Sequence, residues 1–430
     1  MFEKFFKLQA NKTSVKTEII AGITTFMTMA YILAVNPEIL SATGMDKNAV
    51  FTATALSALI ATFIMALVAR LPFALAPGMG LNAFFAYTVV MTMGYSWQFA
   101  LTAVFIEGII FILLTIFNIR ELIVNAIPLS LKHAVSAGIG LFIAFIGLQN
   151  AGVIVGSDVT LVKLGDIESL TVLLSLGGII LISVLLAMKV KGALLIGIFA
   201  VTLAGLPLGV TTLQGDHLAT APPSLEPVFM KFEFSDIFTV DMLIVLFTFL
   251  FVDMFDTVGT LVGVSSKAGM LDKKGRVPRV KQALFADSVG TTIGAILGTS
   301  TVTTYVESAS GVAEGGKTGL TSLTTAVLFL VALFFAPLFT MVPPSATAAA
   351  LVLVGFFMMS PILKIDFDNF TESIPAFVTI IMMPLTYSIA EGIVFGMLSY
   401  VLLKLLTGKI KDISVVMIIL AILFVLKFFI

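Results

Sequence analysis

Two aspartates three residues apart lie inside a long apolar stretch of the sequence. Asp253 and Asp256 belong to the run from Phe251 to Gly259, and their i, i+3 spacing places both carboxylates on one face of a helix. Two carboxylates that meet in a medium of low dielectric constant cannot both be charged easily, because their repulsion is poorly screened. The pair is therefore expected to take up and release a proton.

A third acid, Glu307, lies in a stretch of Ser, Thr and Gly that covers residues 299–317. The Thr, Val and Tyr residues at its start favour a short strand, and Ser308 or Ser310 is expected to cap a following helix. Glu307 would then lie at a helix start within an apolar region. An ionisable residue in such a place is costly and is a functional candidate by default.

A second interrupted apolar stretch covers residues 73–93 and contains Pro77, Gly78 and Gly80. These residues permit an extended chain that leads into a helix. Asn82 follows with one side-chain amide, which can both donate and accept hydrogen bonds. Broken segments leave backbone groups that lipid cannot satisfy, so they are expected to face protein or a water-filled cavity.

The run from Gly311 to Thr318 matches the phosphate-loop pattern G-x-x-x-x-G-K-[ST]. That mechanism requires a preceding buried strand, a soluble α/β sheet and a separate aspartate for Mg²⁺. The match lies between apolar spans, and no polar stretch is long enough for a nucleotide-binding domain. We therefore expect the Gly-rich end of a half-helix, with Lys317 facing the cytoplasm.

The composition defines the class of protein that holds these residues. Of 430 residues, 59% are hydrophobic and 11% are charged, whereas about a quarter of a soluble domain is charged. This excludes an ordinary soluble enzyme and a disordered chain, and the absence of Cys excludes a disulfide scaffold. A net charge of -1 disfavours nucleic acid as a partner, and no Cys or His cluster suggests a metal site. The lipid bilayer is the expected partner.

Apolar runs of the length needed to cross a membrane predict an all-α polytopic protein with about fourteen segments. The predicted segments are 19–35, 49–69, 73–93, 97–117, 133–150, 169–188, 192–210, 240–263, 282–298, 299–317, 319–341, 345–362, 373–388 and 389–407. A further apolar run, 413–430, is either an additional segment or an interfacial one.

The distribution of Lys and Arg predicts the orientation. With a cytoplasmic N-terminus, only Lys47, Lys163, Lys231 and Lys427 of the 24 basic residues fall outside, which agrees with the positive-inside rule. The interrupted segments are the third and the tenth, seven apart. Because seven is odd, the second half starts from the opposite face, as in an inverted repeat. The expected location is the inner or plasma membrane.

Four motifs in order carry a family resemblance. They are residues 76–83, 251–259, 307–319 and 372–377, and together they resemble the AzgA-type branch of the nucleobase–cation symporters. That branch comprises adenine, guanine and hypoxanthine permeases. The resemblance covers nearly the whole chain and implies a seven-plus-seven inverted-repeat fold like that of the uracil permease, with short antiparallel strands in segments three and ten.

The resemblance also implies a division into two domains. Residues 1–132 and 239–343 would form a core domain from segments 1–4 and 8–11. Residues 133–238 and 344–430 would form a gate domain from segments 5–7 and 12–14 with the C-terminal run.

By motif position, the resemblance implies that Glu307, Asp253, Asp256 and Asn82 bind the base and that Glu372 acts in transport; the other roles are expected from the chemistry of a purine. The side chains expected to bind the base are Glu307, Asp253, Asn82, Asp256, Ser308, Tyr305 and Phe26. Asp253, Asp256 and Glu307 are expected to couple proton transfer to transport, and Glu372 to act in transport or gating. Tyr31 and Phe255 are further candidates for stacking on the ring.

The expected function is the uptake of guanine, hypoxanthine or adenine by proton symport, without a cofactor; sodium coupling and a homodimer stay open. Alternatives within transport are a xanthine, uracil or small-anion carrier of the same fold. Three midplane acids and no midplane base argue against an anion. An intramembrane aspartyl protease needs its two aspartates on separate helices, and a channel would not show saturable uptake.

Overall fold

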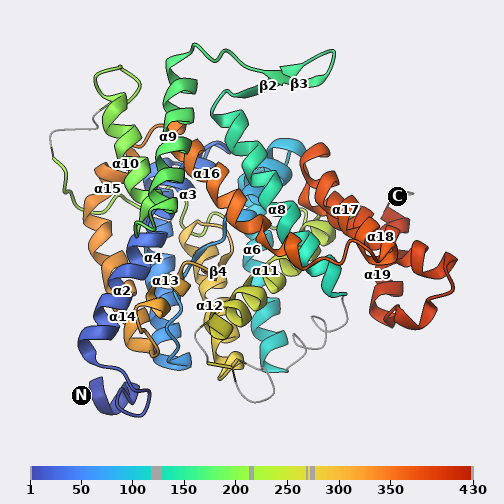
Figure 1. Ribbon diagram of the computed structural model, residues 1–430, viewed down its shortest axis with the longest axis horizontal. Helices are drawn as coiled ribbons and strands as arrows, with labels where there is room; N and C mark the ends of the chain where they lie inside the picture. The colour runs from blue at the N-terminus through green and yellow to red at the C-terminus, as the bar shows by residue number, and fades with distance from the viewer. Residues whose placement is uncertain (1, 118–127, 213–216, 268–269, 272–276, 428–430) are drawn as a thin grey trace.

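The computed structural model describes residues 2–117, 128–212, 217–267, 270–271 and 277–427. Within these ranges, nine helical stretches are long and apolar enough to cross a membrane, and three shorter apolar helices accompany them. The helix α12 (Val280–Leu297) and the segment that joins β4 (Val302–Thr304) to α13 (Ser308–Ala313) complete the fourteen expected segments (Figure 1). The prediction of an all-α polytopic fold is confirmed.

The first half of the chain forms segments one to seven. Its elements are α1 (Phe2–Phe6), α2 (Val15–Met29), α3 (Ile32–Ser41), α4 (Lys47–Ile64), η1 (Met65–Ala69), β1 (Leu75–Pro77), α5 (Met79–Ala83), η2 (Phe84–Thr92), α6 (Trp97–Ile116), α8 (Leu129–Asn150), β2 (Ile154–Ser157), β3 (Leu161–Leu164), α9 (Leu170–Ala187) and α10 (Ala193–Gly205).

The second half forms segments eight to fourteen and ends in an additional helix. Its elements are α11 (Val240–Lys267), α12 (Val280–Leu297), β4 (Val302–Thr304), α13 (Ser308–Ala313), α14 (Gly319–Ala332), η3 (Leu333–Phe335), α15 (Ala336–Thr340), α16 (Pro344–Met359), η4 (Ser360–Lys364), α17 (Phe370–Leu385), α18 (Ile389–Leu406), η5 (Ile410–Asp412) and α19 (Val415–Lys427).

Segment bounds differ from the sequence expectation chiefly at the first span. The predicted single run 19–35 is two helices, α2 and α3, which together cover residues 15–41. The helix is interrupted between Met29 and Ile32, so Tyr31 lies at the break. This break lies next to the tenth segment, since the Thr28 hydroxyl donates to the Glu307 carbonyl at 3.5 Å.

The two interrupted segments meet as an antiparallel pair at the centre of the molecule. Strands β1 and β4 pair in the register Leu75 to Thr304, Ala76 to Thr303 and Pro77 to Val302. The Gly78 amide continues the pairing by donating to the Thr301 carbonyl at 2.9 Å. The expected contact between segments three and ten is thus confirmed, and each half supplies one strand.

Each short strand is also held by a threonine of the preceding long helix. Thr62 of α4 accepts from the Leu75 amide at 2.9 Å and donates to the Leu75 carbonyl at 3.0 Å. Thr291 of α12 does the same for Val302, at 3.3 and 3.0 Å. Backbone groups in a membrane segment need protein partners, because lipid offers none. The same solution in both halves is a structural trace of the internal repeat.

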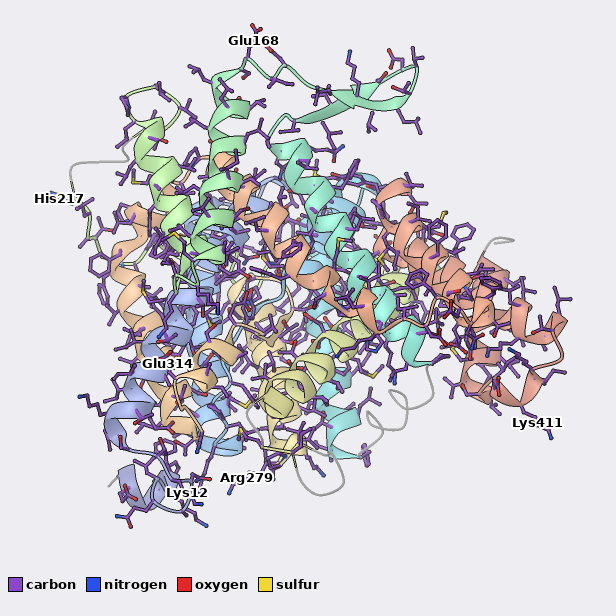
Figure 2. All side chains as sticks on the ribbon, viewed as in Figure 1. Lys12, Glu168, His217, Arg279, Glu314 and Lys411 are labelled. Atoms are coloured by element: carbon purple, nitrogen blue, oxygen red, sulfur yellow. The ribbon has the colours of Figure 1, made fainter. Side chains whose placement is uncertain are left out.

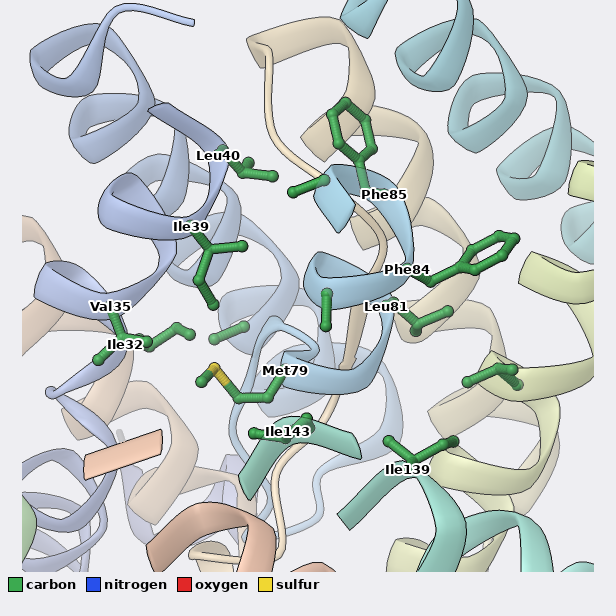
Figure 3. Close-up of a cluster of buried hydrophobic side chains, with 14 of the residues drawn as sticks. Ile32, Val35, Ile39, Leu40, Met79, Leu81, Phe84, Phe85, Ile139 and Ile143 are labelled. Atoms are coloured by element: carbon green, nitrogen blue, oxygen red, sulfur yellow. The ribbon is translucent and has the colours of Figure 1, made fainter. Parts of the chain in front are cut away.

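An apolar core surrounds α5 and η2 (Figure 3). Met79 and Phe84 are almost completely buried, and side chains of α3 and α8 lie on either side of them. Ile139 of α8 is close enough to Gly80 that a Cβ at position 80 would lie 2.7 Å from its Cγ2. Segment three therefore packs tightly between the first and fifth segments.

Charged side chains lie mainly at the periphery. Figure 2 shows Glu168 beyond one end of the helices, with Lys12 and Arg279 at the other end, and Lys411 at the rim near α19. The hairpin β2–β3 projects from the same end as Glu168 (Figure 1). The C-terminal helix α19 packs on α18, so the run after residue 413 forms a helix in addition to the fourteen segments.

Candidate functional site

A cluster of acidic side chains lies beside the crossing of β1 and β4. Asp256 of α11 interacts electrostatically with Asp287 of α12 and with Glu307. Its carboxyl also lies next to Thr303 of β4. The structure therefore brings together Asp256 and Glu307, as the sequence predicted, and adds Asp287, which the sequence analysis missed.

Glu307 lies immediately before α13 and is held by a tyrosine. The Tyr31 hydroxyl donates to Glu307 Oε1 at 2.8 Å, and Tyr31 is only 1% exposed. A carboxylate oriented by a buried phenol has lost much of its rotational freedom before any ligand arrives. Glu307 and Asp256 both keep part of their surface accessible, so they form the open side of the cluster.

Asp253 and Asp287 form the closed side of the cluster, with no solvent exposure. The Thr257 hydroxyl lies 3.0 Å from Asp253 Oδ1 and 2.7 Å from Asp287 Oδ1. A hydroxyl has one hydrogen to donate and two lone pairs to accept. The one hydroxyl hydrogen can point at only one of the two carboxyl groups, so a proton on the other carboxyl would make both contacts full hydrogen bonds.

Tyr305 and Ser308 hold the two interrupted segments together. The Tyr305 hydroxyl donates to the Pro77 carbonyl at 2.5 Å, and its amide donates to the Ala74 carbonyl at 2.9 Å. Ser308 Oγ accepts from the Ala74 amide at 3.0 Å. The expectation that Ser308 or Ser310 caps α13 is wrong, because Glu307 occupies the N-cap position and the Ser308 hydroxyl binds the Ala74 amide instead. Their contact with substrate stays a prediction.

Asn82 is buried on α5, where the Ser300 hydroxyl donates to its Oδ1. Its Nδ2 lies 3.9 Å from Met79 Sδ. Asn36 of α3 similarly donates to Thr299 Oγ1 at 2.9 Å, and Thr301 donates to Glu107 Oε2 of α6 at 2.6 Å. These contacts fix the polar stretch that leads into β4. Substrate contact by Asn82 stays a prediction.

The aromatic candidates have different surroundings. Phe26 is partly buried and packs edge-on against Phe329 of α14, with ring centroids 5.2 Å apart. The side chain of Phe255 lies outside the described residues. Stacking of Phe26 on a base stays a prediction.

Glu372 belongs to a separate polar network at the ends of α8, α17 and α18. It forms an ion pair with Lys404 at 2.7 Å and accepts from Ser130 of α8 and from Tyr400. Lys404 is 3% exposed and also contacts Asp412 at 3.2 Å. Because its partners lie on α8 and α18, Glu372 of α17 fastens the ends of these three helices; its role in gating stays a prediction.

In the segment that matches the phosphate-loop pattern, a carboxylate of the same protein lies where a phosphate would bind. The buried carboxylate of Glu18 accepts from the Lys317 amide at 2.9 Å and from the Thr318 amide at 3.2 Å. It also accepts from the hydroxyls of Thr318 and Thr321, at 2.8 and 2.7 Å. The turn before α14 thus binds an anion, as its sequence pattern favours, but that anion is a side chain of α2. A nucleotide phosphate has no room in these contacts.

Three further buried acids lie outside the interrupted segments, and the sequence analysis did not predict them as site residues. Glu18, Glu107 and Asp287 each lie in a regular helix and have no solvent exposure. Their signal was present in the sequence, since an acid within an apolar run is unusual wherever it occurs. In the part of the chain described here, no group of three His, Cys, Asp or Glu side chains is arranged to hold a metal ion.

The fold and the acid cluster define a membrane transport protein of the seven-plus-seven inverted-repeat class. The transmembrane domain of the cyanobacterial bicarbonate transporter BicA matches with a TM-score of 0.64 and 16% identity, covering 89% of this chain and 97% of that one. SLC26A9 matches with a TM-score of 0.66 and 11% identity, covering 94% of this chain and 68% of the other. These likenesses concern the fold alone, and both structures have this inverted-repeat architecture.

The chain belongs to the Permease family (Xan_ur_permease), which it matches over residues 16–395. It is 46% identical to the adenine permease AdeP of Escherichia coli, covering 99% of this chain and 96% of AdeP. It is 48% identical to the guanine/hypoxanthine permease PbuG of Bacillus subtilis, covering 99% and 98%. The putative permease MJ0326 of Methanocaldococcus jannaschii is 51% identical, covering 99% and 98%. The chain is therefore a transporter and not an enzyme.

Proposed function

We propose that this permease takes up purine nucleobases. Relatives that match over nearly their whole length are named for adenine and for guanine and hypoxanthine. The observation that carries the proposal is the pair of partly accessible carboxyl groups, Asp256 and Glu307, beside the crossing strands. A neutral, planar base rich in N–H donors fits acceptors of this kind.

The recognition step follows from the hydrogen bonds that each base can make. Guanine offers N1–H and its 2-amino group to one carboxylate, which accepts both as a bidentate pair. Hypoxanthine offers N1–H alone. Adenine lacks N1–H and needs a donor opposite N1, which a protonated carboxyl supplies. Glu307, oriented by Tyr31, is the proposed acceptor, and Asp256 is the proposed second carboxyl.

Proton coupling is proposed to involve the closed side of the cluster. The geometry around Thr257 calls for one proton shared between Asp253 and Asp287. Asp256 interacts electrostatically with Asp287 of that pair and with Glu307. A proton that moves along this chain of acids changes the charge that faces the base. This links proton release to base release and makes the two solutes travel together.

Alternating access is proposed to occur between two domains, residues 1–132 with 239–343 and residues 133–238 with 344–430. In support, α8 packs on α16 and α17, whereas α4 and α6 pack on α12 and α2 packs on α14. The helices therefore associate across the repeats within each proposed domain. Rocking of one unit against the other would expose the acid cluster to each side in turn.

Two neighbouring functions are less well supported. An anion carrier has the same fold, as the bicarbonate transporter shows, but the acids Asp253, Asp256, Asp287 and Glu307 would repel an anion. Xanthine or uracil fits the same kind of acceptor, so the choice among bases requires measurement.

A cytoplasmic N-terminus in the inner or plasma membrane is proposed from the distribution of Lys and Arg.

Uptake into proteoliposomes tests the function. We expect saturable uptake of labelled guanine, hypoxanthine or adenine that increases when the interior is made alkaline and falls when a protonophore is added. Replacement of sodium by choline should leave the rate unchanged. No saturable uptake of any purine would overturn the proposal, and uptake that requires sodium would overturn proton coupling alone.

A further inference from the structure

A small cavity lined by cations lies at the end of the molecule that contains α1. Its volume is about 150 Å³, enough for several waters or one phosphate-sized anion. Lys7, Arg70, Arg279 and Lys317 all line it. They come from four places in the chain: the end of α1, the end of η1, the start of α12 and the turn before α14.

The described partners of the four cationic side chains are not carboxylates. In the part of the chain that the structure describes, none of them forms an ion pair with Asp or Glu. Arg279 donates instead to the Ala69 carbonyl at 3.2 Å, and the Arg70 guanidinium lies 4.3 Å from the centre of the Phe5 ring. Cations gathered around one cavity repel each other, and an anion between them relieves that repulsion.

The backbone brings these residues to the cavity at some cost. Lys7, Arg70 and Arg279 all have a positive φ, between 54° and 56°. This left-handed conformation is uncommon for side chains of this size. Strain of this kind persists where the surrounding structure holds a residue in place. Three of the eight non-glycine residues with a positive φ in the described part of the chain line this one cavity.

The cavity lies where a lipid headgroup could reach it. Its lining includes Phe5, which is 39% exposed, and Met270. Figure 2 places Arg279 at the same end as Lys12, beyond the helices. A basic pocket between helix ends on the predicted cytoplasmic side is suited to an anionic headgroup.

We propose that the cavity lined by Lys7, Arg70, Arg279 and Lys317 binds a phosphate group, carried by an anionic lipid or free in solution. Charge-assisted hydrogen bonds from Lys and Arg would surround the phosphate oxygens. The bound group would join α1, η1, α12 and the turn before α14, and so would stabilise that end of the protein. This site is separate from the acid cluster and does not depend on the identity of the transported solute.

Thermal unfolding of the purified protein in detergent tests the proposal. Phosphatidylglycerol, phosphatidylcholine or inorganic phosphate is added at constant ionic strength, and the unfolding temperature is measured against concentration. The test variant is Lys7→Gln with Lys317→Gln, because both lysines are exposed and neither side chain forms a hydrogen bond that the fold needs. The matched control is Lys12→Gln with Lys16→Gln, which removes the same charge from exposed positions outside the cavity.

The unmodified protein and the control variant should be stabilised by phosphatidylglycerol or by phosphate, but not by phosphatidylcholine. The test variant should need about tenfold or more of the same anion for an equal shift. A response to the lipid alone identifies a headgroup site, and a response to inorganic phosphate as well identifies a site for the free anion. No response in the unmodified protein, or equal responses in the two variants, would overturn the proposal.

Discussion

At the scale of single residues, the buried polar groups of this protein are arranged through hydroxyls. Thr257 lies between two aspartates, Tyr31 binds Glu307, and Thr318 and Thr321 bind Glu18. A buried carboxyl group without partners would cost several kcal/mol, roughly the stability of many whole domains. Short hydroxyl side chains from neighbouring helices meet this need without adding charge to the membrane interior.

Tyr31→Phe should weaken base binding without altering the fold. The substitution keeps the ring and removes one hydrogen bond to Glu307, so the carboxylate loses its orientation. We expect the KM for purine uptake to rise about threefold to tenfold. A rise of this size corresponds to the free energy of one hydrogen bond to a carboxylate. Tyr95→Phe is the control, because it removes a bond to Asp241 outside the acid cluster. Equal KM values for the two variants would contradict the role of Tyr31.

Thr257→Val should separate proton coupling from base binding. Valine has nearly the shape of threonine but cannot bridge Asp253 and Asp287. We expect a loss of stability of about 1–3 kcal/mol and a marked loss of uptake driven by a pH gradient. Binding of purine at equilibrium should persist.

Thr260→Val is the matched control for this experiment, one turn beyond Thr257 and partly exposed on the same helix. It should retain both the unfolding temperature and gradient-driven uptake. If Thr257→Val retains gradient-driven uptake as well, the threonine bridge takes no part in proton coupling.

At the scale of secondary structure elements, the crossing strands position the site. Their existence was predictable, because Pro77, Gly78 and the Thr-rich run before Tyr305 interrupt otherwise regular apolar spans. Their register was not, since it depends on the pairing of Leu75 with Thr304, which lie in opposite halves of the chain. Propensity describes a strand locally, whereas pairing is decided by partners far away in the sequence.

Gly78→Ala tests how closely these strands must approach. A Cβ at position 78 would lie 2.8 Å from Thr303 Oγ1 and 2.9 Å from its Cγ2. The pair would have to separate at the point where Asp256 contacts Thr303, so we expect a lower unfolding temperature and reduced uptake. Gly177→Ala is the control, because a Cβ there meets nothing within 4 Å. Normal uptake by Gly78→Ala would show that the strand contact is dispensable.

At the scale of the whole molecule, the sequence predicted the number of segments and the inverted repeat. Both follow from apolar run length and from the odd spacing of the two interruptions. The complete acid cluster could not be predicted, because Asp287 reaches it only through the packing of α12 beside α11. The use of Glu18 by the turn before α14 likewise depends on how α2 packs against α14.

A reversible crosslink tests the proposed movement of the two domains. The Cβ positions of residue 80 on α5 and Ile139 on α8 lie 4.0 Å apart, within the range of a disulfide. The protein has no Cys, so Gly80→Cys with Ile139→Cys introduces one defined pair. Oxidation should abolish uptake and reduction should restore it, because the bond would join the two domains.

The control for the crosslink is Gly178→Cys with Val201→Cys. Its Cβ positions are also 4.0 Å apart, but both helices, α9 and α10, belong to the same proposed domain. Oxidation should leave uptake of this variant intact. Full uptake through an oxidised 80–139 crosslink would contradict movement of α5 relative to α8.

Equilibrium binding of labelled guanine, hypoxanthine and adenine to the purified protein tests the central claim most directly. Xanthine and uracil serve as competitors, and Glu307→Gln and Asp256→Asn are compared with the unmodified protein. We predict saturable binding of at least one purine to the unmodified protein, with affinity reduced about tenfold or more in both variants. No purine binding, or unchanged affinity in both variants, would contradict a purine site at Asp256 and Glu307.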